Sequence, residues 1–371
     1  MHRSRPRFAG ATFAVAVALG LTLLAGPATA ATHVVDAQGG GDFTSLEAAV
    51  AAAASGDLIQ VMPGTYPTSV TIEASLTITG LGDAESVVLD GQGSRIMLLQ
   101  GEETIRLENL TFTGGYGDSG GAILSWQGMD LVIESCRFVD NEAGWGGGAI
   151  EARSATGSLT VRETLFEDNY ATNHAGAVAV MFDIACEIDR CRFVFNRGGA
   201  MAGAFTANAA GSVDIHDSVF TQNTGGDMGA IYLVDSYTNT IRNCTFWNNV
   251  AVGHATVLLH HGVLDLHHNI IGNTAFGGGV EVFYSGLLTS GCNVYWNNDG
   301  GDLIEAQPGE DDWFEDPQLC APGAGDFAPC NESIAVVGTG CGLIGALAPG
   351  CPCGVVRTEA HDWSEIKALF R

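Results

Sequence analysis

Residues 131–150 read LVIESCRFVDNEAGWGGGAI, and residues 159–178 repeat the pattern as LTVRETLFEDNYATNHAGAV. Both segments begin with alternating apolar and polar residues, continue with Phe and an Asn three positions later, and end in small residues. An alternation with a period of two is typical of a β-strand with one buried face. Its recurrence along the chain indicates a repeat architecture, in which each unit packs on its neighbours.

The pattern runs from Ile105 to Asn298 with spacings of 24–28 residues. Its copies begin at Ile105, Leu131, Leu159, Cys186, Val213, Asn239, Leu264 and Leu288. A period this variable is unsuited to a coiled coil and suits solenoid coils with flexible corners. We therefore predict an all-β, single-stranded right-handed parallel β-helix over residues 31–300.

Two ladders of repeated side chains are expected inside this solenoid. Coils stacked about 4.8 Å apart would place the aromatic residues above one another. An inward Asn at each corner can bond the backbone of its own turn and the amide of the next coil. We interpret both ladders as structural. The first is Phe112, Phe138, Phe166, Phe193, Phe220, Phe246, Ile271 and Tyr295; the second is Asn141, Asn169, Asn196, Asn223, Asn249 and Asn298, with Asn273 one residue early.

Glycine-rich corners such as GGAI at 120–123 and 147–150 follow the Asn ladder. Glycine permits the positive φ of a tight corner, and no Gly-Lys-Ser/Thr sequence supports a phosphate-binding loop instead. Phe-x-x-Asn alternating with Gly-Gly-Ala-Ile resembles the repeats of chlamydial polymorphic outer membrane proteins. This resemblance covers residues 105–298 and implies a surface-exposed β-helical passenger involved in adhesion.

The beginning of the solenoid needs a cover, because an open end is an edge that templates aggregation. Residues 44–47 (TSLE) form a capping-box pattern before an apolar stripe, which predicts a short capping α-helix over about 44–54. With GDFT at 41–44 and PGTY at 63–66, the region 35–92 looks like the opening of pectin methylesterase-like and pectate lyase-like β-helices. The catalytic acids and arginines of that pectin lyase-like superfamily are not recognisable here, so the resemblance implies fold rather than activity.

Residues 1–30 have the pattern of a secretory signal peptide, with three arginines, an apolar run and small residues before Ala30. A transmembrane anchor is the competing interpretation, but no later apolar run reaches eighteen residues. Cleavage after Ala30 would remove three of the 15 basic residues and none of the 42 acidic ones, taking the net charge from −27 to about −30.

A surface this acidic repels nucleic acid and anionic membranes and is compatible with divalent cations or neutral glycans. We expect a monomer without a nucleic-acid partner and with no transmembrane segment after signal cleavage. It would be secreted or associated with the cell surface, and polysaccharide or a cell-surface or matrix ligand is the expected partner.

The region 301–353 is expected to form a Cys-rich C-terminal cap, followed by a linker and possible sorting tail at 354–371. High cysteine density in an exported chain indicates disulfides. We predict the pairs Cys320–Cys330 and Cys341–Cys351, with Cys353 left over. A zinc site is the alternative, although spacings of ten residues are unlike ordinary ligand pairs.

Three cysteines of the solenoid share one repeat position in alternate coils: Cys136, Cys191 and Cys244. Neighbours in this series would lie about 9.6 Å apart, which is beyond the reach of a disulfide. We expect them to be small core residues.

The preferred ligand-binding edge is an acidic corner with aromatic residues, formed by Tyr116, Asp118, Asp140, Glu142, Trp145 and Asp168. Calcium favours several oxygen ligands from flexible loops, so Asp118, Asp140 and Asp168 are candidates for a Ca²⁺ site. Aromatic rings in the same loops could stack on sugars. The alternative is a set of exposed turn acids.

The fourth strand position carries Glu108, Glu134, Arg162, Asp189, His216, Arg242 and His267. This column predicts either a lyase-like groove, where an arginine abstracts a proton beside metal-bound acids, or a solvated face with cross-strand charge pairs. A second cluster is His254, His260, His261, His267 and His268. It suggests a transition-metal site or a set of surface histidines. Because side chains alternate along a strand, each adjacent pair should point to opposite faces, so at most a subset could converge.

No hydrolase, metalloprotease or dinucleotide motif is present in the sequence. Catalytic residues are therefore not identified. The sequence favours an exported, non-catalytic β-helix for surface adhesion or for binding glycan or matrix. The alternative is a calcium-assisted polysaccharide lyase or hydrolase of the pectin lyase-like superfamily.

Overall fold

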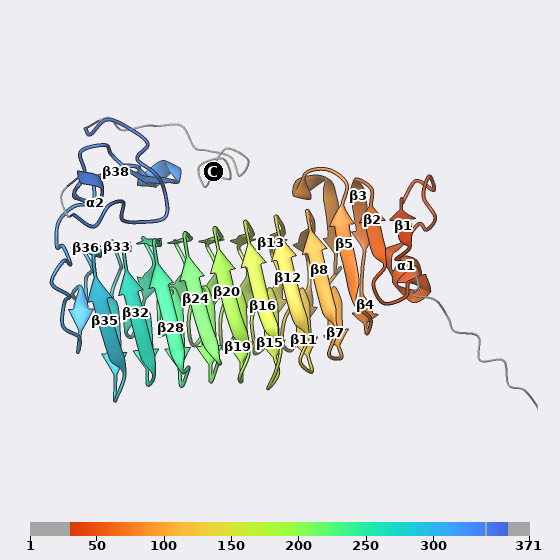
Figure 1. Cartoon of the computed structure of the whole chain (residues 1–371), viewed down its shortest axis with the longest axis horizontal. Helices are drawn as coiled ribbons and strands as arrows, with labels where there is room; N and C mark the ends of the chain where they lie inside the picture. The colour runs from red at the N-terminus through yellow and green to blue at the C-terminus, as the bar shows by residue number, and fades with distance from the viewer. Residues whose placement is uncertain (1–29, 338–339, 355–371) are drawn as a thin grey trace, which may run out of the picture.

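The computed structural model describes residues 30–337 and 340–354. The predicted signal peptide, except for Ala30, lies outside these residues, and so does the predicted tail after residue 354. Within them the chain winds into a long solenoid whose parallel strands stack side by side (Figure 1). This is the predicted right-handed parallel β-helix.

Each coil begins in a sheet that we call sheet A. Leu131 and Ile133 are buried while Val132 and Glu134 are partly exposed, which is the alternation predicted from the sequence. Over the described residues, sheet A contains β1 (Thr32–Val35), β2 (Leu58–Val61), β5 (Leu76–Gly80), β8 (Thr104–Glu108), β12 (Asp130–Glu134), β16 (Ser158–Arg162), β20 (Ala185–Asp189), β24 (Ser212–His216), β28 (Thr238–Arg242), β32 (Val263–His267) and β35 (Leu287–Gly291).

Sheets B and D follow within each coil. Sheet B holds the Phe positions in β3 (Gly64–Pro67), β6 (Val87–Asp90), β9 (Thr111–Thr113), β13 (Arg137–Val139), β17 (Leu165–Glu167), β21 (Arg192–Val194), β25 (Val219–Thr221), β29 (Thr245–Trp247), β33 (Ile270–Gly272) and β36 (Val294–Trp296). Sheet D has two-residue strands just after the Asn ladder: β10 (Tyr116–Gly117), β14 (Glu142–Ala143), β18 (Tyr170–Ala171), β22 (Arg197–Gly198), β26 (Thr224–Gly225) and β30 (Val250–Ala251).

Sheet C closes each coil after the glycine-rich corner. Its last strand lies after residue 300, so the solenoid continues past the predicted domain boundary. Sheet C contains β4 (Val70–Ile72), β7 (Met97–Gln100), β11 (Ile123–Trp126), β15 (Ile150–Arg153), β19 (Val178–Met181), β23 (Phe205–Asn208), β27 (Ile231–Val234), β31 (Ala255–His260), β34 (Gly278–Phe283) and β37 (Leu303–Ile304).

The predicted aromatic ladder forms a continuous stack in the core. From Phe112 to Phe246, neighbouring rings are nearly parallel and their centroids lie 4.6–5.1 Å apart. Ile271 and Tyr295 continue the same row in the following coils. Each buried aromatic side chain contributes about 1.5–3 kcal/mol through the apolar area that it removes from water.

The predicted Asn ladder is also present. The Nδ2 group of Asn196 donates to the Phe166 carbonyl at 2.9 Å and to Asn223 Oδ1 at 3.0 Å, and the neighbouring ladder members repeat both bonds. The interpretation of Asn273 was wrong. Thr274 occupies the inward position, where its N–H donates to Asn298 Oδ1, while Asn273 adopts a left-handed conformation in the turn.

A second polar row lies at the corner between sheets A and B. The backbone N–H of Cys191 donates to Ser218 Oγ at 3.0 Å, and the N–H of Cys244 donates to Asn269 Oδ1 at 2.9 Å. Cys136 and Thr164 make the same bond in earlier coils. The solenoid cysteines are buried, as predicted, and they alternate with hydroxyl or amide residues that accept these bonds.

The capping helix α1 (Leu46–Ala52) covers the first coil. Ser45 is its N-cap and accepts a hydrogen bond from the Ala48 N–H. The expected capping box does not form, because the N-cap is Ser45 rather than Thr44 and the N3 position is therefore Ala48 rather than Glu47. The Glu47 carboxylate accepts a hydrogen bond from the Ser69 N–H instead. A short 3₁₀ helix, η1 (Ala84–Ser86), follows in a later coil.

The far end of the solenoid is closed by residues 303–314. Phe314 stacks on Tyr295, the last aromatic of the ladder, with ring centroids 5.5 Å apart. Asp312 accepts hydrogen bonds from the backbone and side-chain N–H groups of Asn293, which ends the second polar row. The last coil is therefore covered by matching side chains.

The Cys-rich segment packs beside the solenoid, on the outer face of sheet B. Its elements are β38 (Leu319–Ala321), η2 (Pro322–Ala324), β39 (Asp326–Pro329) and α2 (Ile334–Val337). Ile344 and Leu347 belong to a buried cluster with Val219, Ile270 and Val294. This contact spans several coils.

The predicted disulfide pairing is wrong. The structure pairs Cys292 with Cys341, Cys320 with Cys351, and Cys330 with Cys353. The first bond connects the solenoid to the cap, because the chain folds back along sheet B and brings Cys341 close to Cys292. The disulfides also leave these thiols unavailable for the alternative zinc site.

Candidate functional site

The predicted acidic corner is divided between two turns. Tyr116 and Glu142 are neighbours on the exposed side of sheet D. Asp140 and Asp168 lie at equivalent positions in the preceding corner of their coils, where each has a left-handed backbone conformation. Burial raises the pKa of Asp168, and the negative charge of Asp140 raises it further.

The structure does not bring together the three carboxylates proposed as calcium ligands, those of Asp118, Asp140 and Asp168. Asp118 lies beyond sheet D, next to Arg95, and is separated from the other two by the short strand. Among residues 30–337 and 340–354, three sets of side chains bring potential metal ligands within 4.8 Å of one another, and these three carboxylates do not form one of the sets.

The loops between sheets D and C fold over the outer face of sheet C. They are held coil to coil by backbone hydrogen bonds, such as Trp145 N–H to the Asp118 carbonyl at 2.7 Å and His174 N–H to the Trp145 carbonyl at 2.9 Å. Beneath them runs a column of outward side chains, almost all of them buried: Leu124, Glu151, Ala179, Thr206, Tyr232, Leu258 and Glu281.

Glu151 is the anchor of the first cluster on this flank, which we call the tryptophan patch (Trp126, Trp145, Glu151, Arg153 and His174). The Glu151 side chain is 0% exposed and forms an ion pair with Arg153. The Arg153 guanidinium lies over the Trp126 ring, 5.6 Å from its centroid. A buried carboxylate requires such a partner, because an isolated buried charge is very costly.

Trp145 completes the tryptophan patch from the covering loop. Its ring meets the imidazole of His174 edge to face, with centroids 5.8 Å apart. Burial lowers the pKa of His174, and the positive charge of Arg153 lowers it further. The two indoles are substantially exposed, at 40% for Trp126 and 55% for Trp145. The patch therefore presents two aromatic surfaces beside fixed polar groups.

A second cluster, the histidine cavity, lies farther along the same flank. It encloses about 210 Å³ and is lined by Asp227, Met228, Tyr232, His254, Leu258, His260, Phe283 and Tyr284. His254 Nδ1 lies 3.2 Å from Oε2 of the buried Glu281. Ligand sites commonly combine an apolar lining with a few fixed polar groups, as this cavity does.

The five histidines of the sequence cluster separate into different environments. His254 and His260 line the cavity, His267 pairs with Asp265, and His268 bonds the Cys341 carbonyl in the cap. The expectation that His260 and His261 point to opposite faces was wrong. β31 ends at His260 and His261 has a φ of +64°, so strand alternation stops and the two rings lie 4.6 Å apart.

The predicted charged column is present on the outer face of sheet A. Arg162, Asp189 and His216 are in register, and Asp189 is buried against His216 and Arg190, whose Nη2 lies 2.8 Å from Asp189 Oδ2. Burial raises the pKa of Asp189. Arg162 bonds both oxygens of Glu187 at 2.9 Å. The column is thus a network of cross-strand ion pairs.

One comparison with known protein families bears on this architecture. A family model described as the right handed beta helix region matches residues 166–309. This chain is a parallel β-helix repeat protein. No curated protein matches it.

Among solved structures, this β-helix protein is similar to the PL6 family alginate lyase AlyGC, at 13% sequence identity and a TM-score of 0.29. The match covers 76% of this chain and 53% of that one, so the chain spans about half the length of AlyGC. No activity is inferred from a likeness of this size. In the part of the β-helix protein that the structure describes, no helix is long and apolar enough to cross a membrane.

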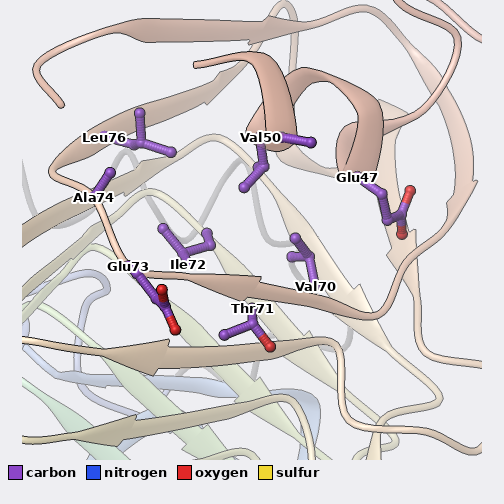
Figure 2. Close-up of a pocket in the computed structure, with 9 residues that line it drawn as sticks. Glu47, Val50, Val70, Thr71, Ile72, Glu73, Ala74 and Leu76 are labelled. Carbon is purple, nitrogen blue, oxygen red and sulfur yellow. The ribbon is translucent and has the colours of Figure 1, made fainter. Parts of the chain in front are cut away.

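A larger cavity of about 440 Å³ lies at the capped end of the β-helix, between α1 and β4 (Figure 2). Val50 on the helix faces Val70 and Ile72 on the strand, and Glu47 and Glu73 lie at its two sides. Glu47 already accepts the Ser69 N–H. Because this cavity gathers apolar cap residues and few polar groups, it is a less specific candidate site than the flank of sheet C.

Sequence reasoning identified Trp145 and several histidines but missed Glu151, Arg153 and Glu281. The available indication was in the last strand of each coil, which belongs to sheet C. Glu151 and Glu281 stand in a column that is otherwise apolar or small, in register with Leu124 and Leu258. An acid at a position where neighbouring coils bury Leu would have marked the flank.

Proposed function

We propose that this protein is a non-catalytic β-helix that binds polysaccharide through the flank of sheet C. The observation that carries the proposal is the tryptophan patch, where two exposed indoles lie beside the Glu151–Arg153 ion pair. Trp supplies a large, rigid contact surface at low cost in conformational entropy. The buried ion pair holds Arg153 in place as a donor for hydroxyl groups.

Further aromatic rings on the same flank support a linear ligand. Phe182 and Tyr284 follow β19 and β34 at equivalent turn positions and are 53% and 76% exposed. Because coils repeat about every 4.8 Å, these rings are distributed along the solenoid axis. A polymer lying along the axis could contact several of them at once.

The charge of the chain favours a neutral glycan over a polyuronate. At a net charge of −27, the protein as a whole repels acidic polymers. Binding would then depend on stacking and hydrogen bonds rather than on attraction between net charges, and would be only weakly sensitive to salt.

Export and surface adhesion complete the proposal. The N-terminal pattern of arginines, apolar residues and small residues supports export, and so do the three disulfides, which persist in oxidising compartments. An exported glycan-binding solenoid would serve in attachment to matrix or to a cell surface.

A polysaccharide panel tests the proposal. Binding of neutral and acidic glycans is measured by isothermal titration calorimetry with wild type, Trp126→Ala and Trp145→Ala. We expect a neutral glycan to bind and each substitution to weaken its Kd by at least about tenfold, the scale of a lost aromatic anchor. Phe195→Ala is the matched control, because this exposed aromatic lies in the turn between sheets B and D. Unchanged affinity in both Trp variants would contradict the proposal.

A calcium-assisted polysaccharide lyase or hydrolase is the second candidate function. The observation that favours it is the juxtaposition of Asp189, Arg190 and His216 on the outer face of sheet A, which places groups able to transfer a proton together, with any Ca²⁺ bound elsewhere. The same panel is scored for depolymerisation with Ca²⁺ and with chelator, using wild type and Asp189→Asn. Products that disappear on chelation and in the variant would replace the non-catalytic proposal, whereas binding without turnover would exclude the enzyme.

A further inference from the structure

Asp235, His260 and His261 bring three metal-ligating groups together at the corner where sheet C turns toward sheet A. One ligand atom from each side chain lies within 4.8 Å of the others. His261 Nδ1 is 3.0 Å from Asp235 Oδ1. The three residues come from adjacent coils, joined by a backbone hydrogen bond of 3.0 Å from Asp235 N–H to the His260 carbonyl.

This arrangement is built by the left-handed turns that end the strands. Asp235 follows β27 with a φ of +52°, and His261 follows β31 with a φ of +64°. Both side chains are thereby directed to the same corner rather than to alternate faces of the sheet. The ladder hydrogen bonds on either side hold the two turns in register.

The donor set matches a transition-metal ion. Two imidazole nitrogens and one carboxylate are typical ligands of Zn²⁺ and of neighbouring divalent ions. Ligand atoms about 2.0–2.2 Å from a tetrahedral ion lie roughly 3.3–3.5 Å apart, so the 3.0 Å pair needs only a small adjustment. Three protein ligands would leave a position for water or another ligand.

Two further observations support a ligand at this corner. The Nδ1 atom of His260 is buried and has no hydrogen-bond partner among the described residues, which is costly for a polar atom unless something binds it. Tyr284 packs beside the site, with its ring centroid 4.7 Å from that of His260 and 5.3 Å from that of His261. The aromatic ring supports the orientation of both imidazoles.

The geometric alternative at Glu187, Asp189 and His216 differs in its charge environment. Asp189 Oδ1 is also buried without a hydrogen-bond partner. However, Arg162 bonds both Glu187 oxygens and Arg190 pairs with Asp189 Oδ2, so two guanidinium groups would repel a cation there. A third group contains Cys292 and Cys341, whose sulfur atoms form a disulfide.

We propose that Asp235, His260 and His261 bind one divalent transition-metal ion, Zn²⁺ or an ion of similar preference, beside the histidine cavity. His260 belongs to both structures, so a bound ion would place positive charge at the edge of a cavity that also contains Asp227. The proposal does not depend on the polysaccharide proposal.

The test measures binding of Zn²⁺ to the full chain, purified without a polyhistidine tag, by isothermal titration calorimetry. We expect one site per chain, weakened at least about tenfold by His260→Gln, His261→Gln and Asp235→Asn. His267→Gln is the matched control. His267 also pairs with an acid, Asp265, but among the described residues this pair belongs to no set of three potential metal ligands. Co²⁺ gives a second readout through the visible absorption of a tetrahedral site, which should disappear in the same three variants.

Asp235 and His261 have side chains that are 58% and 40% exposed, so Asp235→Asn and His261→Gln should fold even if His260→Gln does not. Stoichiometric binding that is lost in these variants and kept in the control supports the site. The proposal is overturned if wild type binds no stoichiometric Zn²⁺, if the variants bind like wild type, or if His216→Gln removes the binding instead.

Discussion

Gly146 lies directly against the carboxylate of Glu151. A Cβ atom at position 146 would be 1.4 Å from Glu151 Oε2 and 3.3 Å from the Ser119 side chain. The covering loop can therefore close over the buried acid only because residue 146 has no side chain. Since Trp145 precedes it, this contact also sets where the exposed indole of the tryptophan patch stands.

The first prediction concerns Gly146→Ala. The added methyl group must displace either Glu151 or the loop, and overpacking of this kind costs roughly 1–3 kcal/mol in the free energy of unfolding. Urea denaturation followed by circular dichroism measures the change. Gly144→Ala is the control, because its Cβ would meet nothing closer than 3.8 Å and should cost little.

A double-mutant cycle tests the stated cause. In a Glu151→Ala background the carboxylate is gone, so Gly146→Ala should become much less destabilising. If the cost of Gly146→Ala is the same in both backgrounds, the contact with Glu151 does not explain it.

The second prediction concerns the Asn ladder. Asn196→Ala removes an acceptor for the N–H and Nδ2 groups of Asn169 and a donor to the Phe166 carbonyl, all of them buried. Leaving these three buried polar groups unpaired should lower the free energy of unfolding by roughly 3–9 kcal/mol, at about 1–3 kcal/mol for each group. Chemical denaturation checks the value. Asn331→Ala, at an exposed position in the cap, should change it by less than about 0.5 kcal/mol.

The sequence predicted the ladders because repetition leaves little freedom. Because coil after coil has the same alternation and the same spacing from Phe to Asn, Phe138 must stack between Phe112 and Phe166, and Asn141 must meet Asn169. The path of residues 305–354 has no such repeat. Their return along sheet B, and hence the bond between Cys292 and Cys341, depends on contacts that only the folded chain defines, such as the hydrogen bond from Gly345 N–H to the His268 carbonyl.

The candidate site was predicted less completely than the fold. Trp145 was chosen for its loop, but its relation to Arg153 and Trp126 depends on how that loop folds over sheet C. The convergence of His260 with His261 depends on the strand ending at His260. Strand periodicity assumes that the strand continues, so it fails at the turns, and both clusters of the flank lie beside turns.

The third prediction concerns pH and Asp57. Its carboxylate accepts hydrogen bonds from the Ala54 and Ala31 N–H groups, at 2.8 and 2.7 Å, and lies 3.0 Å from His33 Nε2. These contacts lower the pKa of Asp57 to about 2, from an ordinary value of 3.8. The group titrates at lower pH in the folded state, so its stabilisation is present above about pH 4 and is lost as the pH falls toward about 2.

Unfolding by urea at several pH values between about 5 and 2 measures this dependence. Asp57→Asn should be less stable than wild type at the upper end and should lose less stability as the pH falls. Asp83→Asn should follow the wild-type curve, because the Asp83 side chain forms no capping hydrogen bond with η1. Parallel curves for wild type and Asp57→Asn would show that Asp57 is not responsible for the loss of stability at low pH.

The fourth prediction concerns the disulfide that ties the cap to the solenoid. Cys292 and Cys341 are 49 residues apart, and closing a loop of that size restricts the unfolded chain by about 4 kcal/mol in the entropy model. Replacing both residues by Ala should lower the free energy of unfolding by a comparable amount. It should also increase hydrogen exchange around Ile344 and on the outer face of sheet B, because the cap would no longer be tethered there.

Replacing Cys330 and Cys353 together is the matched control. Their bond closes a loop of 23 residues within the cap, so its loss should loosen the cap without increasing exchange on sheet B. Peptide mapping under non-reducing conditions provides the direct check. Fragments linking Cys320 to Cys330, or Cys341 to Cys351, would contradict the observed pairing, and with it the argument that the cap is held against the solenoid by a covalent bond.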